Sequence, residues 1–75
     1  MKTKYKYIEF QLQPGSSPSW LCINRKHSDQ LGAVVYSNGW RQYIYEPTVQ
    51  AIYSASCLRD IAEFLEACKK AGEAI

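Results

Sequence analysis

The sequence lacks any long apolar run, and no apolar stretch follows Met1. A transmembrane helix needs about 20 predominantly apolar residues, and a secretory leader needs an apolar segment of roughly 7–15 residues. We therefore expect no signal peptide, no membrane contact and a cytoplasmic protein. Length sets a second limit, because 75 residues form one domain (1–75) and leave no room for the large cofactor-binding units of enzymes.

Cysteine is scarce and odd in number, with only Cys22, Cys57 and Cys68. Cys57 and Cys68 lie on one predicted helix, separated by about 16 Å along its axis, whereas a disulfide needs Cα atoms within about 7 Å. A bond from Cys22 to either of them stays open. Three reduced thiols in a cytosolic protein are the simpler interpretation.

The residue patterns of catalytic and metal sites are missing. His27 and Asp29 lack a third ligand at metal-site spacing, and Cys22 falls inside a predicted strand. Ser16 and Ser17 lack the glycine context of a nucleophile elbow and have no paired base. We therefore expect no catalytic, cofactor or metal site, and a protein that is not an enzyme.

Strong charge of one sign is also lacking, because the formal net charge is +2. Residues 1–45 carry six basic against two acidic side chains, and residues 46–75 carry three against five. The first half is therefore basic and the second acidic, but the balance is too weak to identify a partner.

Alternating residues and turn signals predict the strands. Residues 5–12 alternate, with Ile8, Phe10 and Leu12 on one face. A Pro/Gly/Ser cluster over 14–19 separates them from the next strand, and Asn38-Gly39 predicts a two-residue hairpin turn. The predicted strands are 5–12, 20–24, 31–36 and 40–45, with 49–53 as an optional fifth.

The residues from 56 to 71 predict an amphipathic helix. Its apolar side chains fall on one arc at 100° per residue, and its charged side chains fall opposite. That arc contains Cys57, Leu58, Ile61, Ala62, Phe64, Leu65 and Cys68. The expected fold is α+β, an antiparallel β-meander of four or five strands with one C-terminal helix packed on one face.

The two-residue turn divides the hairpin side chains between two faces. One is aliphatic, with Ala33 opposite Ile44 and Val35 opposite Gln42; the other pairs Tyr36 with Arg41. We expect the aliphatic face under the helix, which leaves an open face with Tyr36, Arg41, Tyr43 and Tyr45, joined by Tyr5 and Tyr7. The reverse orientation would instead expose Trp40, Gln42 and Ile44.

An open face of tyrosine and arginine favours a protein partner, since both residue types are enriched at interface hot spots. Nucleic acid is the alternative, because aromatic rings on a basic sheet stack unpaired bases. An ordinary solvated face, a homodimer and a structural domain of an oligomer also stay open.

The order Trp20, Asn24, Leu31-Gly32, Trp40-Arg41-Gln42-Tyr43, Pro47 and Cys57-Leu58-x-Asp60-Ile61-x-x-Phe64 resembles a group of very short phage and bacterial proteins without an assigned function. The resemblance covers roughly residues 20–70. It implies a β-meander with a helix and a mobile-element setting, in which small non-catalytic proteins often bind and block a host or defence protein.

A second resemblance, at the level of the fold, is to sheet-plus-helix DNA-binding domains of plants and of integrases, whose sheet Arg and Trp side chains enter the major groove. Arg25, Trp40 and Arg41 are the positions that match, without the dense arginine pattern of those domains. The predicted partner-binding residues are therefore Arg25, Tyr36, Trp40, Arg41, Tyr43 and Tyr45.

Overall fold

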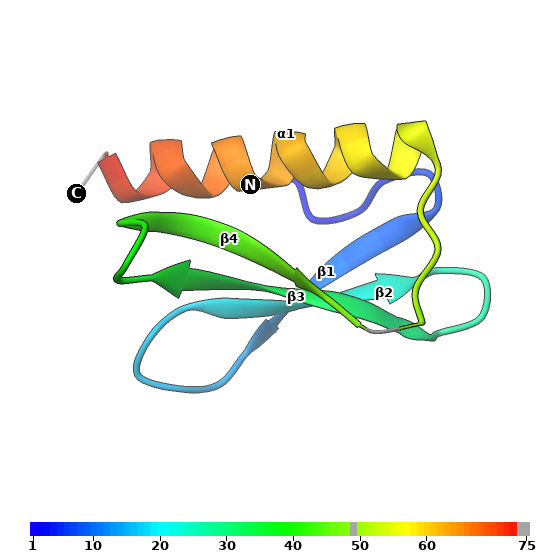
Figure 1. The fold of residues 1–75 in the computed structure, drawn as a ribbon, viewed down its shortest axis with the longest axis horizontal. Coiled ribbons are helices and arrows are strands. Elements are labelled where there is room, and N and C mark those ends of the chain that lie inside the picture. The colour runs from blue at the N-terminus through cyan, green and yellow to red at the C-terminus, as the bar shows by residue number, and fades with distance from the viewer. Residues whose placement is uncertain (49, 74–75) are drawn as a thin grey trace.

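The computed structural model describes residues 1–48 and 50–73. Four antiparallel strands form one sheet in the order β1-β2-β3-β4, followed by a single C-terminal helix that lies across one face (Figure 1). The elements are β1 (Ile8–Gln13), β2 (Ser19–Asn24), β3 (Gln30–Ser37), β4 (Gln42–Pro47) and α1 (Ala55–Glu73). The predicted α+β meander with one packed helix is confirmed.

The optional fifth strand is not formed over residues 50–53, and Val49 lies outside the described residues. Residues 50–54 instead lead into α1, where the Ser54 hydroxyl accepts a hydrogen bond from the Cys57 N–H at 3.2 Å and caps the helix. Within the described residues, α1 is the one helix, and it is too polar to cross a membrane.

The turn between β3 and β4 differs from the prediction. Ser37 pairs with Gln42, so the connection is a four-residue loop rather than a two-residue one. The left-handed residue is Arg41, with φ of 55°, whereas Asn38 and Gly39 keep ordinary backbone angles. The Trp40 N–H bonds the Ser37 hydroxyl at 3.2 Å and supports this longer loop.

The predicted orientation of the sheet is wrong. The longer loop shifts the pairing by two residues, so the side chains still divide into the same two sets. The set under α1, however, contains Val34, Tyr43 and Tyr45, and the aliphatic set lies on the far side. Strand pairing explains this, because Phe10 pairs with Cys22 and Cys22 with Gly32, which places the buried Phe10 on the face of Val34.

We call the two sides the covered face and the open face. The core lies between α1 and the covered face of the sheet and consists of Tyr5, Ile8, Phe10, Cys22, Val34, Ile61, Phe64 and Cys68. The open face carries half-buried aliphatic side chains, namely Leu21, Ile23, Ala33, Val35 and Ile44. Tyr45 suits the covered face because its ring fills the space there while its hydroxyl bonds that of Tyr53 at the margin.

Three single residues also depart from the prediction. Tyr5 is buried under α1 rather than open, because residues 1–7 fold back along β1. Leu12 is 66% exposed, since the twist of the sheet carries the β1–β2 turn away from α1 (Figure 1). Leu58 is 53% exposed because the buried arc of α1 centres on Ile61, Phe64 and Cys68 and leaves Leu58 at its margin.

Candidate functional site

A continuous series of aromatic rings runs from the surface into the core. Tyr36 meets Tyr43 edge to face at 5.3 Å between centroids, and Tyr43 meets Trp20 at 5.9 Å. Trp20 then contacts Phe64 at 5.4 Å, and Phe64 stacks on Phe10 at 3.9 Å. Because the inner rings are packed between β1, β2 and α1, the outer rings rest on a rigid support.

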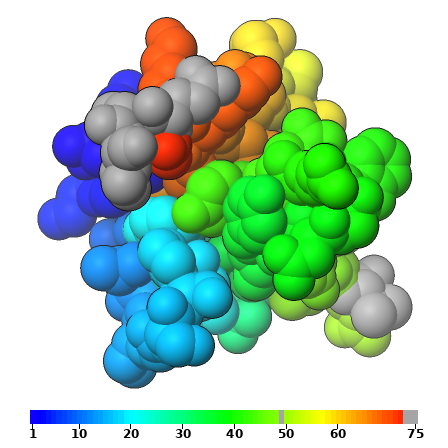
Figure 2. Space-filling view, turned by 90° about the vertical axis from the view of Figure 1, so that its left-hand side faces the viewer, coloured from blue at the N-terminus to red at the C-terminus, as the bar shows by residue number. Residues whose placement is uncertain are grey.

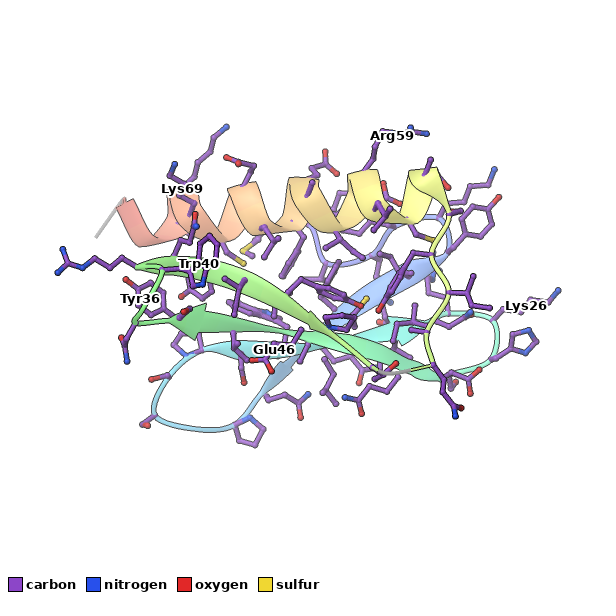
Figure 3. All side chains as sticks on the ribbon, viewed as in Figure 1. Lys26, Tyr36, Trp40, Glu46, Arg59 and Lys69 are labelled. Carbon is purple, nitrogen blue, oxygen red and sulfur yellow. The ribbon has the colours of Figure 1, made fainter. Side chains whose placement is uncertain are left out.

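The outer end of this series lies at the β3–β4 turn. Trp40 in this turn is 73% exposed, and Tyr36 near the end of β3 is 46% exposed, so two large rings are open to solvent close together. Lys69 of α1 lies at the same end of the molecule (Figure 3). We call Tyr36, Trp40, Arg41, Tyr43 and Lys69 the aromatic corner; Figure 2 faces this end, with the turn in green beside α1.

Two hollows meet at the aromatic corner. A hollow of 390 Å³ is lined by Tyr36, Arg41, Gln42, Tyr43, Lys69 and Gly72. A groove of 530 Å³ between β4 and α1 is lined by Trp40, Gln42, Tyr43, Ile44, Tyr45, Ala62, Leu65, Glu66 and Lys69. Gln42, Tyr43 and Lys69 line both, so the groove, in which Glu66 accompanies Lys69, continues into a second, smaller hollow.

Tyr45 serves the fold rather than the surface. Its hydroxyl lies 2.9 Å from that of Tyr53, and the Tyr53 hydroxyl donates to the Leu31 carbonyl. Burial, followed by the bond to Tyr53, raises the pKa of Tyr45 far above its usual range. The ring crosses Gly32, where an added Cβ would lie 2.5 Å from the Tyr45 Cζ atom, so Gly32 is needed for this close approach.

Arg25 belongs to the opposite end of the molecule, in the turn between β2 and β3. Its guanidinium donates a 2.6 Å hydrogen bond to the Tyr5 carbonyl, which ties the turn to the N-terminal segment. We call Lys6, Arg25, Lys26 and His27 the basic end. These four side chains line a hollow of 860 Å³ together with Tyr7, Asn24, Ile52, Ser54, Ser56 and Cys57.

The six predicted partner-binding residues therefore separate into three groups. Tyr36, Trp40, Arg41 and Tyr43 come together at the aromatic corner, Tyr45 packs between sheet and helix, and Arg25 lies at the basic end. The prediction from the sequence did not include Lys69 and Leu65 among the partner-binding residues. Both lie on α1 and line the groove. The signal was present, because Leu58, Ala62, Leu65 and Lys69 recur at helical spacing along one side of the helix.

The chemistry available in the chain is limited. All three cysteines are free, and burial raises the pKa of the Cys22 and Cys68 thiols to about 11, which makes them poor nucleophiles at neutral pH. The described residues contain no group of three His, Cys, Asp or Glu side chains placed to hold a metal ion.

No known protein family, curated protein or solved structure matches this chain. The resemblance to short phage and bacterial proteins stays a prediction from the residues, and functional inference depends on the surface itself.

Proposed function

We propose that this protein is a non-catalytic binding protein that engages a protein partner through the aromatic corner. The observation that carries the proposal is the pair of exposed rings at one end of the sheet, Trp40 in the β3–β4 turn at 73% and Tyr36 near the end of β3 at 46% exposure. Trp, Tyr and Arg are the residue types in which interface binding energy concentrates.

Support from beneath makes Tyr36 a suitable anchor. Tyr36 rests against Tyr43, which continues through Trp20 to the buried Phe64. An anchor that is already held in place loses less conformational freedom on binding, so more of its contact energy appears as affinity. The cations Arg41 and Lys69 at the rim favour a partner with acidic residues around an apolar centre.

The resemblance to phage and bacterial proteins adds the biological setting of the proposal. In that setting the partner is a host or defence protein, and binding blocks its action.

Quantitative affinity capture from a bacterial lysate tests this proposal. Tyr36→Ala and Trp40→Ala should each lower recovery of the captured protein by about fivefold or more, the effect of losing more than about 1 kcal/mol. Tyr7→Ala is the matched control, since Tyr7 is 48% exposed at the basic end. Equal recovery with the Tyr36 and Trp40 variants and the wild type would exclude the aromatic corner.

A second candidate function is nucleic-acid binding at the basic end, favoured by its four clustered basic side chains beside the exposed Tyr7. Phosphate contacts would make such binding steeply dependent on salt. Titration of single-stranded and duplex oligonucleotides at two salt concentrations tests it. Sub-micromolar affinity that is lost with Tyr7→Ala and Arg25→Ala, but not with Tyr36→Ala, would place the function at the basic end.

A further inference from the structure

The outer edge of β4 carries main-chain groups without partners. The Thr48 N–H donates to the Leu31 carbonyl at 2.9 Å, which sets the phase of the β3–β4 ladder. Because bonding alternates along an antiparallel strand, Gln42, Ile44 and Glu46 bond to β3, and Tyr43 and Tyr45 point their N–H and C=O groups outward. Among residues 1–48 and 50–73, no strand pairs with this edge.

The opposite edge of the sheet is covered by the chain itself. Along β1, the outward Phe10 N–H bonds the Thr3 carbonyl at 2.8 Å, and the outward Ile8 carbonyl accepts from Tyr5 N–H at 2.8 Å. Open edges are usually protected by charges, bulges, proline or a covering segment. The centre of β4, from Gln42 to Tyr45, has no charged residue and no proline, and its pairing with β3 is continuous.

We propose that two copies of this chain pair through β4, antiparallel and edge to edge, with Ile44 at the two-fold axis. This register places Tyr43 opposite Tyr45 of the second copy, so their outward main-chain groups form hydrogen bonds in both symmetry-related places. The result is one eight-stranded sheet with both helices on the same side.

Side-chain complementarity favours a second copy as the occupant. Gln42 and Glu46 lie on the open face near the two ends of β4, and both side chains are exposed. In the antiparallel register the Gln42 amide lies opposite the Glu46 carboxylate of the second copy, so a hydrogen-bond donor meets an acceptor at both ends of the seam. An in-register parallel pairing would instead bring the two Glu46 carboxylates together.

The groove beside β4 extends this seam. Its helical wall includes Ala62 and Leu65, and Leu58, which is 53% exposed, follows on the same side of α1. Two-fold pairing turns the grooves of the two copies toward each other and shields these apolar groups. The two β3–β4 turns then lie at opposite ends of the seam, so each dimer carries two aromatic corners.

Sedimentation equilibrium from about 1 µM to 1 mM protein tests the pairing, with a concentration-dependent dimer as the expected result. Ile44→Lys should raise the dissociation constant by about tenfold, because two ammonium groups would then face each other across the axis. Val35→Lys is the matched control, since Val35 pairs with Ile44 on the same face but lies one strand away from the seam. It should leave dimerisation unchanged.

Mixing provides a control for misfolding. Ile44→Lys and Ile44→Glu chains should each dimerise weakly alone and pair strongly when mixed. Amide exchange by NMR supplies the second measurement: in the wild type, raising the concentration should slow exchange at Tyr43 and Tyr45 and leave the Ile44 N–H, already bonded to β3, unchanged.

A wild type that stays monomeric to about 1 mM, or a dimer that is unaffected by Ile44→Lys, would overturn the pairing. If amide exchange at Tyr43 and Tyr45 slows only after a lysate protein is added, and not when the wild-type concentration is raised, the β4 edge pairs with a strand of another protein instead. Tyr36 lies on β3 and does not line the groove beside β4, so Tyr36→Ala should lower affinity capture and leave dimerisation unchanged, which separates a failure of the proposed function from a failure of the pairing.

Discussion

Two adjacent valines of β3 show how different the two faces of the sheet are. Val34 is fully buried on the covered face, whereas Val35 lies half-buried on the open face. The covered face combines large rings with very small residues, and the open face consists of medium-sized aliphatic side chains. Apolar character alone therefore does not decide which face a helix covers; the fit of large and small side chains does.

Gly32 and Tyr45 illustrate this fit. The missing side chain of Gly32 leaves the space through which the Tyr45 ring crosses the sheet. The Tyr45 hydroxyl then finds Tyr53 at the margin of the core, so burial of the ring leaves no polar group unsatisfied. The open face has no such pairing of large and small residues, and none of the described residues forms a second layer over it.

The largest effect is expected from Phe64→Ala. Phe64 is fully buried, stacks on Phe10 and contacts Trp20, so its truncation should lower the free energy of unfolding by about 3–5 kcal/mol. Urea denaturation measures the change. Leu58→Ala is the control on the same helix, and it should cost less than about 1 kcal/mol because Leu58 is 53% exposed.

If Phe64→Ala abolishes folding, Phe64→Leu gives a measurable intermediate loss of about 1 kcal/mol. Similar losses for Phe64→Ala and Leu58→Ala would contradict the assignment of the covered face.

Alkaline pH should destabilise the folded state by ionising side chains that are buried on the covered face. Burial raises the pKa of the Cys22 and Cys68 thiols from 9.0 to about 11 and that of Tyr5 from 10.0 to about 12. The folded state thus keeps protons that the unfolded state releases. The contribution of each buried thiol to the free energy of unfolding is therefore fully present below pH 9. It is lost as the pH rises to 11, by about 2–3 kcal/mol for each thiol.

Urea midpoints between pH 8 and 11 measure this loss. Cys22→Ala removes one of the titrating groups, so its midpoint should depend less on pH than that of the wild type. Midpoints that stay constant to pH 11 would show that these thiols are not buried.

Much of the fold was predictable from local signals. The 3.6-residue period placed α1 within two residues at each end, and alternation with turn residues located all four strands. These signals come from residues that are close together in the sequence. The loop at Asn38-Gly39 shows their limit: the two-residue turn is a general preference, and here Arg41 takes the left-handed conformation while Trp40 bonds back to Ser37.

The candidate site was predictable only in part. Tyr36 and Arg41 were predicted from the face that the hairpin register gives them, and Trp40 was predicted from the resemblance to DNA-binding domains. Arg25 lies at the other end because successive turns of a meander alternate between the two ends of the sheet, whereas the contribution of Lys69 from α1 depends on which face the helix covers. That choice is made by packing between residues far apart in the sequence, such as Phe10, Cys22 and Gly32, and no local pattern contains it.

Gly32→Ala and Gly39→Ala compare a glycine in a crowded position with a glycine in an open one. At Gly32 the added Cβ would lie 2.5 Å from the Tyr45 ring and 2.6 Å from the Glu46 carbonyl oxygen, so the strands must shift. We expect a loss of about 1–3 kcal/mol, measured by thermal unfolding. Gly39→Ala is the control, because its Cβ would meet only the Ser37 hydroxyl at 3.9 Å. Equal melting temperatures for the two variants would contradict the close approach of Tyr45.

The smallest effect, and the most direct test of the two faces, comes from Val34→Thr and Val35→Thr. Threonine keeps the shape and strand preference of valine and adds one hydroxyl. At position 34 the hydroxyl would be buried against the core, and the loss should be about 1–2 kcal/mol. At position 35 it reaches water on the open face, and stability should stay within about 0.5 kcal/mol of the wild type. Urea denaturation of both variants under one set of conditions gives the difference. A larger loss for Val35→Thr than for Val34→Thr would mean that α1 covers the aliphatic face after all.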